Sequence, residues 1–244
     1  MSTPTPGATW QQEDLAASFL QRRGDFVPML DEQEDIVRRL LERHGRAVTR
    51  FLDLGCGDGA LTQLVIDAYP SAEGVLVDFS EPMLKRAGER VGRLGGRGTL
   101  VRADLNDPTW TQQLPGGRYD AIVSGLAIHH LPADRKRGLF AELFGLLAAG
   151  GVFVNMDYVL VEGPLQGLFD EKKMDALQAD REAAGAEGLE EVIVDEDDDD
   201  RPDLAQAQVQ WLGEAGFEHA EVQFKWAEAA VMAGFKPDPR KGER

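Results

Sequence analysis

Cysteine is almost absent from this sequence: Cys56 is the single cysteine among 244 residues. One cysteine excludes an intramolecular disulfide and fits a reducing compartment. No apolar run of about 18 residues occurs, so no membrane-spanning helix is expected. The opening residues, MSTPTPGATW, have neither the basic stretch nor the apolar stretch of a secretion signal. These absences predict a cytoplasmic protein that does not cross a membrane.

Basic residues are also scarce, because 26 lysines and arginines face 43 aspartates and glutamates, for a net charge of −17. Such a chain repels polyanions on average, so neither nucleic acid nor an anionic membrane is expected as a partner. Apolar residues make up 43% of the chain, which is enough for a sizeable core. The length suits one large domain, or one domain with an added subdomain. A monomer or a homodimer is expected.

Most of the chain alternates between short apolar runs and segments with apolar residues at helical spacing. The runs predict strands over 50–54, 74–78, 99–104, 119–128 and 152–160. The helical segments predict helices over 31–44, 59–69, 80–91 and 132–151. This alternation predicts an α/β fold with a doubly wound, Rossmann-like, mostly parallel sheet and helices on both faces.

The end of the chain follows another pattern. A helix over 203–217 precedes two strands, 217–224 and 226–235, whose short connection requires an antiparallel pair. The expected sheet therefore has seven strands and ends in a C-terminal antiparallel hairpin. An insertion at about 163–203 holds a predicted helix and the acidic run Asp195–Asp200. The run is interpreted as a solvated loop, or as a site for a cation, a basic partner or a cationic substrate.

The stretch FLDLGCGDGA, residues 51–60, joins an apolar strand to a turn with glycines at 55, 57 and 59. Glycines there allow unusual backbone angles and the close approach of a ligand. Dinucleotides favour the spacing G-x-G-x-x-G, and carboxylates such as Asp53 and Asp58 would repel their pyrophosphate. The two acids favour a ligand with a cationic amino group and no phosphate, such as S-adenosylmethionine.

The glycine turn resembles motif I of the class I S-adenosylmethionine-dependent methyltransferases. Further stretches resemble later motifs of that family in the expected order: LVDFSEPML, VRADLND, YDAIVSGLAIHHLP and LFAELFGLLAAGGVFVNMDYV. The resemblance covers roughly residues 45–160 and, in topology, the final hairpin. It implies a methyltransferase domain over 45–244, preceded by an N-terminal helical lid segment over 1–44.

The resemblance also implies how the adenosyl part of the cofactor is bound. Asp78, at the end of the second strand, would bind the ribose hydroxyls, and Phe79 and Met83 would pack on the adenine. Asp104 would accept the adenine amino group, and Leu105 would offer its backbone. Other interpretations remain, because Asp104 could simply cap a helix and Met83 could belong to the core.

The methionine part would lie along the glycine turn. The residues implied there are Asp53, Gly55, Cys56 and Gly57, with Ser124 at the end of the fourth strand. Asp53 could instead stabilise the turn itself. Cys56 is not expected to be a nucleophile, because no motif pairs it with a base.

Two further residues are candidates for catalysis. His129, followed by His130, comes after the fourth strand and could take a proton from a substrate, although histidines in this loop could also be structural. Asp157, at the end of the fifth strand, could act as a base or anchor the substrate. No spacing of histidines and carboxylates indicates a metal motif, so no metal site is predicted.

The sequence therefore predicts a methyltransferase that uses S-adenosylmethionine and transfers its methyl group to an oxygen, nitrogen or carbon atom of a small molecule. A tRNA- or protein-directed methyltransferase is an alternative. So is a non-catalytic S-adenosylmethionine-binding partner protein. A nicotinamide-dependent oxidoreductase is disfavoured by the glycine spacing and by Asp53.

Overall fold

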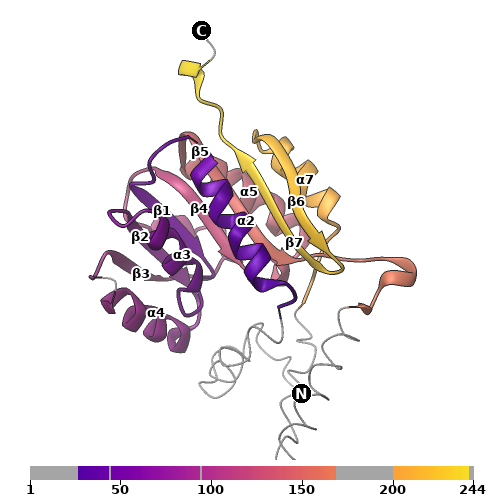
Figure 1. Cartoon of the computed structure of the whole chain (residues 1–244), viewed down its shortest axis with the longest axis horizontal. Coiled ribbons are helices and arrows are strands. Elements are labelled where there is room, and N and C mark those ends of the chain that lie inside the picture. The colour runs from indigo at the N-terminus through magenta and orange to yellow at the C-terminus, as the bar shows by residue number, and fades with distance from the viewer. Residues whose placement is uncertain (1–26, 44, 94, 169–199, 242–244) are drawn as a thin grey trace, which may run out of the picture.

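The computed structural model describes residues 27–43, 45–93, 95–168 and 200–241. The strands are β1 (Arg50–Leu54), β2 (Glu73–Asp78), β3 (Gly98–Arg102), β4 (Tyr119–Gly125), β5 (Leu147–Tyr158), β6 (Glu218–Trp226) and β7 (Ala229–Phe235). The α-helices are α2 (Leu30–Arg43), α3 (Ala60–Ala68), α4 (Glu81–Arg93), α5 (Ala133–Leu146) and α7 (Ala205–Glu214). Short 3-10 helices include η3 (Ile128–His130). Figure 1 shows these elements around one sheet.

The sheet has seven strands in the order β3-β2-β1-β4-β5-β7-β6. The first five strands pair in parallel, while β7 pairs antiparallel with both β5 and β6. The predicted doubly wound sheet with a C-terminal antiparallel hairpin is confirmed. The strand order reverses between β1 and β4, where open α/β sheets bind their ligands. Among the described residues, no helix is long and apolar enough to cross a membrane.

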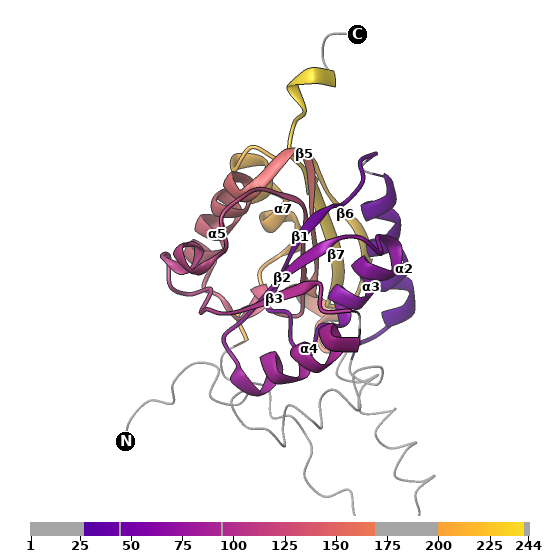
Figure 2. The same ribbon diagram turned by 90° about the vertical axis from the view of Figure 1, so that its left-hand side faces the viewer.

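Helices cover both faces of the sheet, as Figure 2 shows from the side. On one face, α5 and α7 lie over a core that includes Trp110, Phe140, Phe153 and Trp211. On the other face, α2 and α3 pack on Phe51 and its neighbours, and α4 packs on β2. Alternate residues of each strand contribute to these two cores. Because both faces of a strand are then apolar, the strand sequences are nearly continuous apolar runs.

Several element boundaries differ from the sequence predictions, and two of them have a clear physical cause. Strand β4 ends at Gly125 rather than Ile128, because Leu126 adopts a positive φ of 54° and the chain then forms η3. The helix expected to run to Gly151 ends at Leu146, since Leu147 already pairs with Tyr119 as the first residue of β5. Pairing with the sheet thus outweighs the helical preference of the sequence LAA.

The two segments least clear in the sequence are only partly described. Residues 1–26, most of the predicted helix over 164–183 and the acidic run up to residue 199 lie outside the described residues. Of the predicted lid segment, α2 is described. It buries Val37 and Leu41 against the sheet core. The proposed boundaries at 44 and 163–203 stay predictions.

Candidate functional site

The glycine turn after β1 lies at the point where the strand order reverses. Gly55 has a φ of 58°, and a Cβ placed on it would lie 2.2 Å from the Cβ of Ala127 in the loop after β4. Gly57 has a φ of 53°, but a Cβ there would meet no atom of the described residues within 4 Å. Gly55 is therefore required by packing between two loops. The space beside Gly57 is open to a ligand.

Asp78, the last residue of β2, binds this turn directly. Its Oδ2 accepts a hydrogen bond from the backbone N–H of Gly57 at 2.9 Å, and its Oδ1 accepts one from Ser80 at 2.8 Å. The side chain is almost completely buried. Burial raises the pKa of Asp78 above its usual value, although these backbone N–H groups oppose the shift. The fold thus holds a carboxyl group beside the open face of the turn.

The two acids of the turn have different environments. Asp53 is buried, and its Oδ2 accepts a hydrogen bond from Thr62 Oγ1 in α3 at 2.6 Å. Asp58 forms an ion pair with Arg90 of α4, whose Nε also donates to the Asp58 carbonyl oxygen at 2.8 Å. Asp58 therefore has a cationic partner within the protein, which reduces the negative charge that it presents to a ligand.

The side chains of Cys56 and Ser124 are largely inaccessible to a ligand bound at the turn. The Cys56 side chain packs in a cluster with Leu76, Leu84 and Ala87. Burial raises the pKa of this thiol well above its usual value, and the charge of Asp78 adds to the shift. Ser124 is buried and donates its hydroxyl to the carbonyl oxygen of Leu54 at 3.0 Å. Any contact with a ligand would come from the Cys56 backbone.

The residues predicted to contact adenine follow β2 and β3. Met83 is buried in the first turn of α4, and Phe79 is half-buried. Asp104 is exposed, and its Oδ1 accepts a hydrogen bond from the Asn106 backbone at 2.8 Å. Leu105 is buried and accepts a hydrogen bond from Arg135 at its carbonyl oxygen. Because β2 and β3 are adjacent parallel strands, these residues gather at one edge of the sheet.

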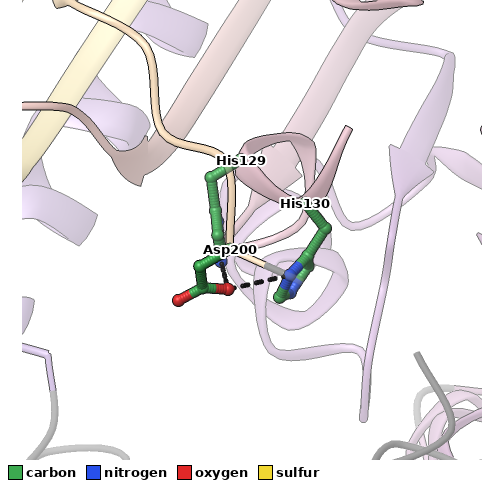
Figure 3. A group of neighbouring side chains, drawn as sticks. All are labelled: His129, His130 and Asp200. Carbon is green, nitrogen blue, oxygen red and sulfur yellow. Dashed lines mark ion pairs between the residues drawn. The ribbon is translucent and has the colours of Figure 1, made fainter. Parts of the chain in front are cut away.

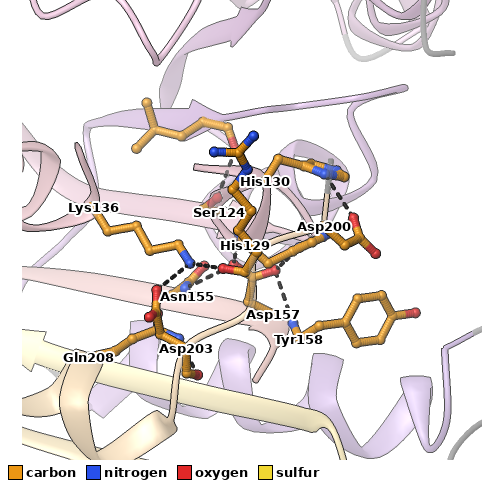
Figure 4. Close-up of polar contacts among 12 residues, drawn as sticks. Ser124, His129, His130, Lys136, Asn155, Asp157, Tyr158, Asp200, Asp203 and Gln208 are labelled. Carbon is orange, nitrogen blue, oxygen red and sulfur yellow. Dashed lines mark hydrogen bonds and ion pairs between the residues drawn. The ribbon is translucent and has the colours of Figure 1, made fainter. Parts of the chain in front are cut away.

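His129 and Asp157 form a buried pair at the ends of β4 and β5 (Figure 4). His129 Nδ1 lies 2.5 Å from Asp157 Oδ1, and the His129 backbone N–H donates to Asp157 Oδ2 at 3.0 Å. Asn155 Nδ2 and the Tyr158 backbone N–H also donate to this carboxylate. The Asp157 side chain has an exposed fraction of 0%. It therefore acts on its surroundings through His129.

Asp200 joins this pair from the far end of the acidic insertion (Figure 3). Its Oδ1 lies 3.3 Å from His129 Nε2 and 3.0 Å from His130 Nδ1. Burial alone would lower the pKa of His129, but the charges and hydrogen bonds of Asp157 and Asp200 raise it to about 9. Burial would raise the pKa of Asp200, but hydrogen bonds from both histidines hold it well below its usual range. The two carboxylates therefore favour the protonated form of His129 in this conformation, which opposes a role as a base.

The segment that carries Asp200 is held in place by several contacts. The Arg201 backbone N–H donates to the His129 carbonyl oxygen at 3.0 Å. Lys136 of α5, with no exposed side chain, donates to the Arg201 carbonyl oxygen and lies 2.6 Å from Asp203 Oδ2. Residues 200–203, the strap, therefore cross the loop that bears the histidines. Since Ala127 in the same loop touches Gly55, the glycine turn and the histidines form one continuous region.

Comparison with known proteins identifies this arrangement. A family described as "Methyltransferase domain" matches residues 51–151, which include the glycine turn, Asp78 and both histidines. A trans-aconitate 2-methyltransferase from Streptomyces avermitilis is 37% identical over 92 residues, 38% of this chain and 33% of that protein. Residues 51–151 therefore form the methyltransferase domain of a class I S-adenosylmethionine-dependent enzyme.

Other similarities to this methyltransferase extend over more of the chain. A carboxy-S-adenosyl-L-methionine synthase from Nautilia profundicola is 22% identical over 92% of this chain and 93% of that protein. The solved structure of human N-acetylserotonin methyltransferase in complex with S-adenosylmethionine has a TM-score of 0.64 at 15% identity. It matches 96% of this chain, while the chain spans only 60% of that structure. The similarity to this solved structure supports a methyltransferase fold for the chain.

The sequence alone did not reveal several members of the site. Asp200 was one of six consecutive acids, and nothing in their spacing distinguishes it. No metal motif was predicted from the sequence, and no spacing in it indicates that His129, His130 and Asp200 bring three possible ligand atoms within 4.8 Å of one another. Thr62 could have been noticed, since a hydroxyl in the first turn of a helix after an acidic strand can reach that acid.

Proposed function

We propose that this methyltransferase transfers a methyl group from S-adenosylmethionine to a small-molecule acceptor. The observation that carries the proposal is the junction of two features at one edge of the sheet. The open glycine turn with Asp78 abuts, through Ala127, the loop that carries His129 and His130. A donor bound at the turn and an acceptor bound near the histidines would then be neighbours, as direct transfer requires.

Each predicted cofactor contact has a role in this proposal. Asp78 accepts hydrogen bonds from the ribose hydroxyls, and the space beside Gly57 admits the methionine part. Asp53, held by Thr62, supplies negative charge behind the turn. Phe79 and Met83 pack on the adenine, which Asp104 and Leu105 recognise at its edge. When bound, the cofactor supplies a methyl group on a sulfonium, whose departure as a neutral thioether needs no further activation.

The acceptor would bind on the side of the histidines. His129 is the residue proposed to contact it, and Asp157 is a positioning residue that fixes the imidazole ring through Nδ1. The small size of the proposed acceptor rests on the strap, which crosses this loop, and on the net charge of −17, which disfavours tRNA. A protein acceptor is the remaining macromolecular alternative.

A second candidate function comes from the relatives that match nearly the whole chain. They are named carboxy-S-adenosyl-L-methionine synthases, with 22% and 27% identity over 92% of this chain. A chain with that function would modify the adenosyl compound itself rather than use it as a methyl donor. Mass spectrometry of reaction products separates the two functions. Methyl transfer yields S-adenosylhomocysteine and a methylated acceptor, whereas the second function yields a carboxylated S-adenosylmethionine.

The first experiment is calorimetric titration of the full chain with S-adenosylmethionine, S-adenosylhomocysteine and NAD. We expect binding of both adenosyl compounds and none of NAD. Asp78→Ala should weaken binding tenfold or more, because a charge-assisted contact contributes about 1.5–3 kcal/mol. Asp67→Ala, an exposed acid of α3, is the matched control and should bind like wild type.

Any of three results would count against this proposal. Unchanged affinity in Asp78→Ala would overturn the ribose assignment. Tight cofactor binding without turnover on any of a broad set of small acceptors would favour the non-catalytic partner protein. NAD binding in place of the adenosyl compounds would instead favour an oxidoreductase.

A further inference from the structure

The two histidines of η3 converge on one oxygen atom. His129 Nε2 lies 3.3 Å and His130 Nδ1 lies 3.0 Å from Asp200 Oδ1. Figure 3 marks both ion pairs with dashed lines. All three candidate ligand atoms lie within 4.8 Å of one another. Two imidazoles and a carboxylate, from two segments far apart in the chain, therefore face a single small volume.

These separations suit a bound metal ion. Zinc takes nitrogen and oxygen ligands at about 2.0–2.2 Å in tetrahedral geometry, so neighbouring ligand atoms lie about 3.3–3.5 Å apart. The two observed separations from Asp200 Oδ1, 3.3 Å and 3.0 Å, are close to that spacing. We propose that His129, His130 and Asp200 bind a divalent transition-metal ion.

The surroundings of His129 fit this role. Its Nδ1 contacts Asp157 Oδ1, which fixes the ring and directs Nε2 toward Asp200. A carboxylate that bonds the second nitrogen of a histidine is the common support of a metal-binding imidazole. Asp157 is completely buried and has Asn155 and Tyr158 as further donors, so its own position is well defined.

Asp200 is also held in position from behind. The next residue, Arg201, bonds the backbone of His129, and Lys136 bonds the Arg201 carbonyl oxygen. The ion pair between Lys136 and Asp203 then fixes the rest of the strap. Ligands whose backbones are linked in this way need little rearrangement to bind an ion.

The ligand types select the kind of metal. Imidazole nitrogens suit Zn²⁺, Fe²⁺ and similar ions, whereas Mg²⁺ and Ca²⁺ prefer oxygen ligands alone. Three protein ligands leave at least one coordination position for another molecule. The site adjoins the glycine turn, so this position would bind an oxygen atom of the methyl acceptor. This last step rests on the proposed function and narrows the acceptor to a hydroxyl- or carboxyl-bearing molecule.

The test is titration of the chelator-treated full chain with ZnCl₂, followed by calorimetry. Co²⁺ serves as a second probe, because its visible absorption reports the coordination geometry. We expect one strongly bound ion per chain and weaker binding of Mg²⁺. His130→Ala and Asp200→Asn should each weaken Zn²⁺ binding at least tenfold. His219→Asn, a change to an exposed histidine of β6, is the matched control and should leave binding unchanged.

Two outcomes would overturn the proposal. If His130→Ala and Asp200→Asn bind Zn²⁺ like wild type, the ion is held elsewhere, for example by the remaining acids of Asp195–Asp200. If wild type binds no Zn²⁺, the three side chains form only a hydrogen-bonded cluster. Zn²⁺ binding is measured without cofactor or acceptor, so its failure is distinct from a failure of S-adenosylmethionine binding in the same preparation.

Discussion

At the scale of single residues, Asp78 shows how the fold prepares a carboxyl group for a ligand. Burial raises the pKa of Asp78, and the N–H groups of Gly57 and Ser80 compensate only part of this shift. A raised pKa means that folding favours the protonated form. The contribution of Asp78 to stability is therefore present at low pH and is lost as pH rises through the folded-state pKa.

Cofactor affinity should depend on pH in the opposite direction. In the proposed complex the ribose hydroxyls would donate hydrogen bonds to the ionised carboxylate, so affinity should fall as pH drops through the raised pKa of Asp78. Titration calorimetry from neutral to mildly acidic pH measures this effect. Because His130 and Cys56 also interact electrostatically with Asp78, the comparison includes Asp78→Asn, which should show weak binding with little pH dependence. A wild-type affinity that stays constant into the acid range would contradict the assignment.

The proposed function places His129 on the acceptor side, so its loss should affect turnover and not cofactor binding. We expect His129→Ala to reduce kcat at least tenfold while the affinity for S-adenosylmethionine stays within about twofold, since contacts made near the transition state act on rate. His219→Asn again serves as the control. Equal kcat values in His129→Ala and wild type would show that the histidine is structural.

At the scale of elements, the turn after β1 contains two glycines with different tasks. Gly55 lets the loop after β4 approach, and Gly57 leaves room beside the turn. Both have positive φ, which a side chain adopts only at a cost of about 1–2 kcal/mol. The sequence pattern G-x-G-x-G does not separate these tasks, because they depend on what lies opposite each glycine.

The two substitutions to alanine should therefore behave differently. Gly55→Ala adds a clash with Ala127 to its strain and should destabilise the fold by more than about 2 kcal/mol. Gly57→Ala should cost only about 1–2 kcal/mol and mainly weaken cofactor binding. Chemical denaturation and calorimetry measure the two effects, with Gly116→Ala as a control that meets no neighbouring atom. Equal destabilisation by both substitutions would contradict the different tasks assigned to Gly55 and Gly57.

The strap depends on one buried cation. Lys136 has no exposed side chain and pairs with Asp203, whose side chain keeps 26% exposure. Lys136→Met should destabilise the fold by about 2–4 kcal/mol, since removing one partner leaves a partly buried charge uncompensated. Denaturant unfolding measures the change, and Lys85→Met on the exposed face of α4 should stay within about 0.5 kcal/mol of wild type. A loss of stability in Lys136→Met no greater than that in Lys85→Met would mean that the ion pair between Lys136 and Asp203 contributes little to stability.

At the scale of the whole molecule, the sheet order and the net charge act together. The order β3-β2-β1-β4-β5 brings the ends of β1, β2, β4 and β5 to one edge, so residues of four separate motifs meet there. The net charge of −17 disfavours the approach of polyanions on average. Topology thus sets where ligands bind, and charge influences which ligands approach.

We expect no measurable binding of bulk tRNA by about 10 µM protein at physiological salt, because nonspecific binding requires clustered lysines and arginines. Filter binding or fluorescence anisotropy measures this directly, and lysozyme, a basic protein, is a positive control for polyanion binding. Salt-sensitive binding at micromolar concentration would instead support the tRNA-directed alternative.

The sequence by itself determined the fold class, the family resemblance and the order of the motifs. Apolar periodicity and glycine spacing are local properties, so FLDLGCGDGA and LVDFSEPML predict a strand, a turn and a ligand class without knowledge of distant contacts. Element ends were less predictable. The start of β5 at Leu147 depends on pairing with Tyr119, a partner in another strand.

Only the tertiary structure decided how the acids are used. Asp58 and Asp53 look alike in the sequence of the turn, but Asp58 forms an ion pair with Arg90 and Asp53 accepts a hydrogen bond from Thr62. Asp200 becomes a partner of two histidines because Lys136 and Asp203 hold the strap against η3. These contacts join residues distant in the chain, and their geometry arises only when packing brings separate elements together.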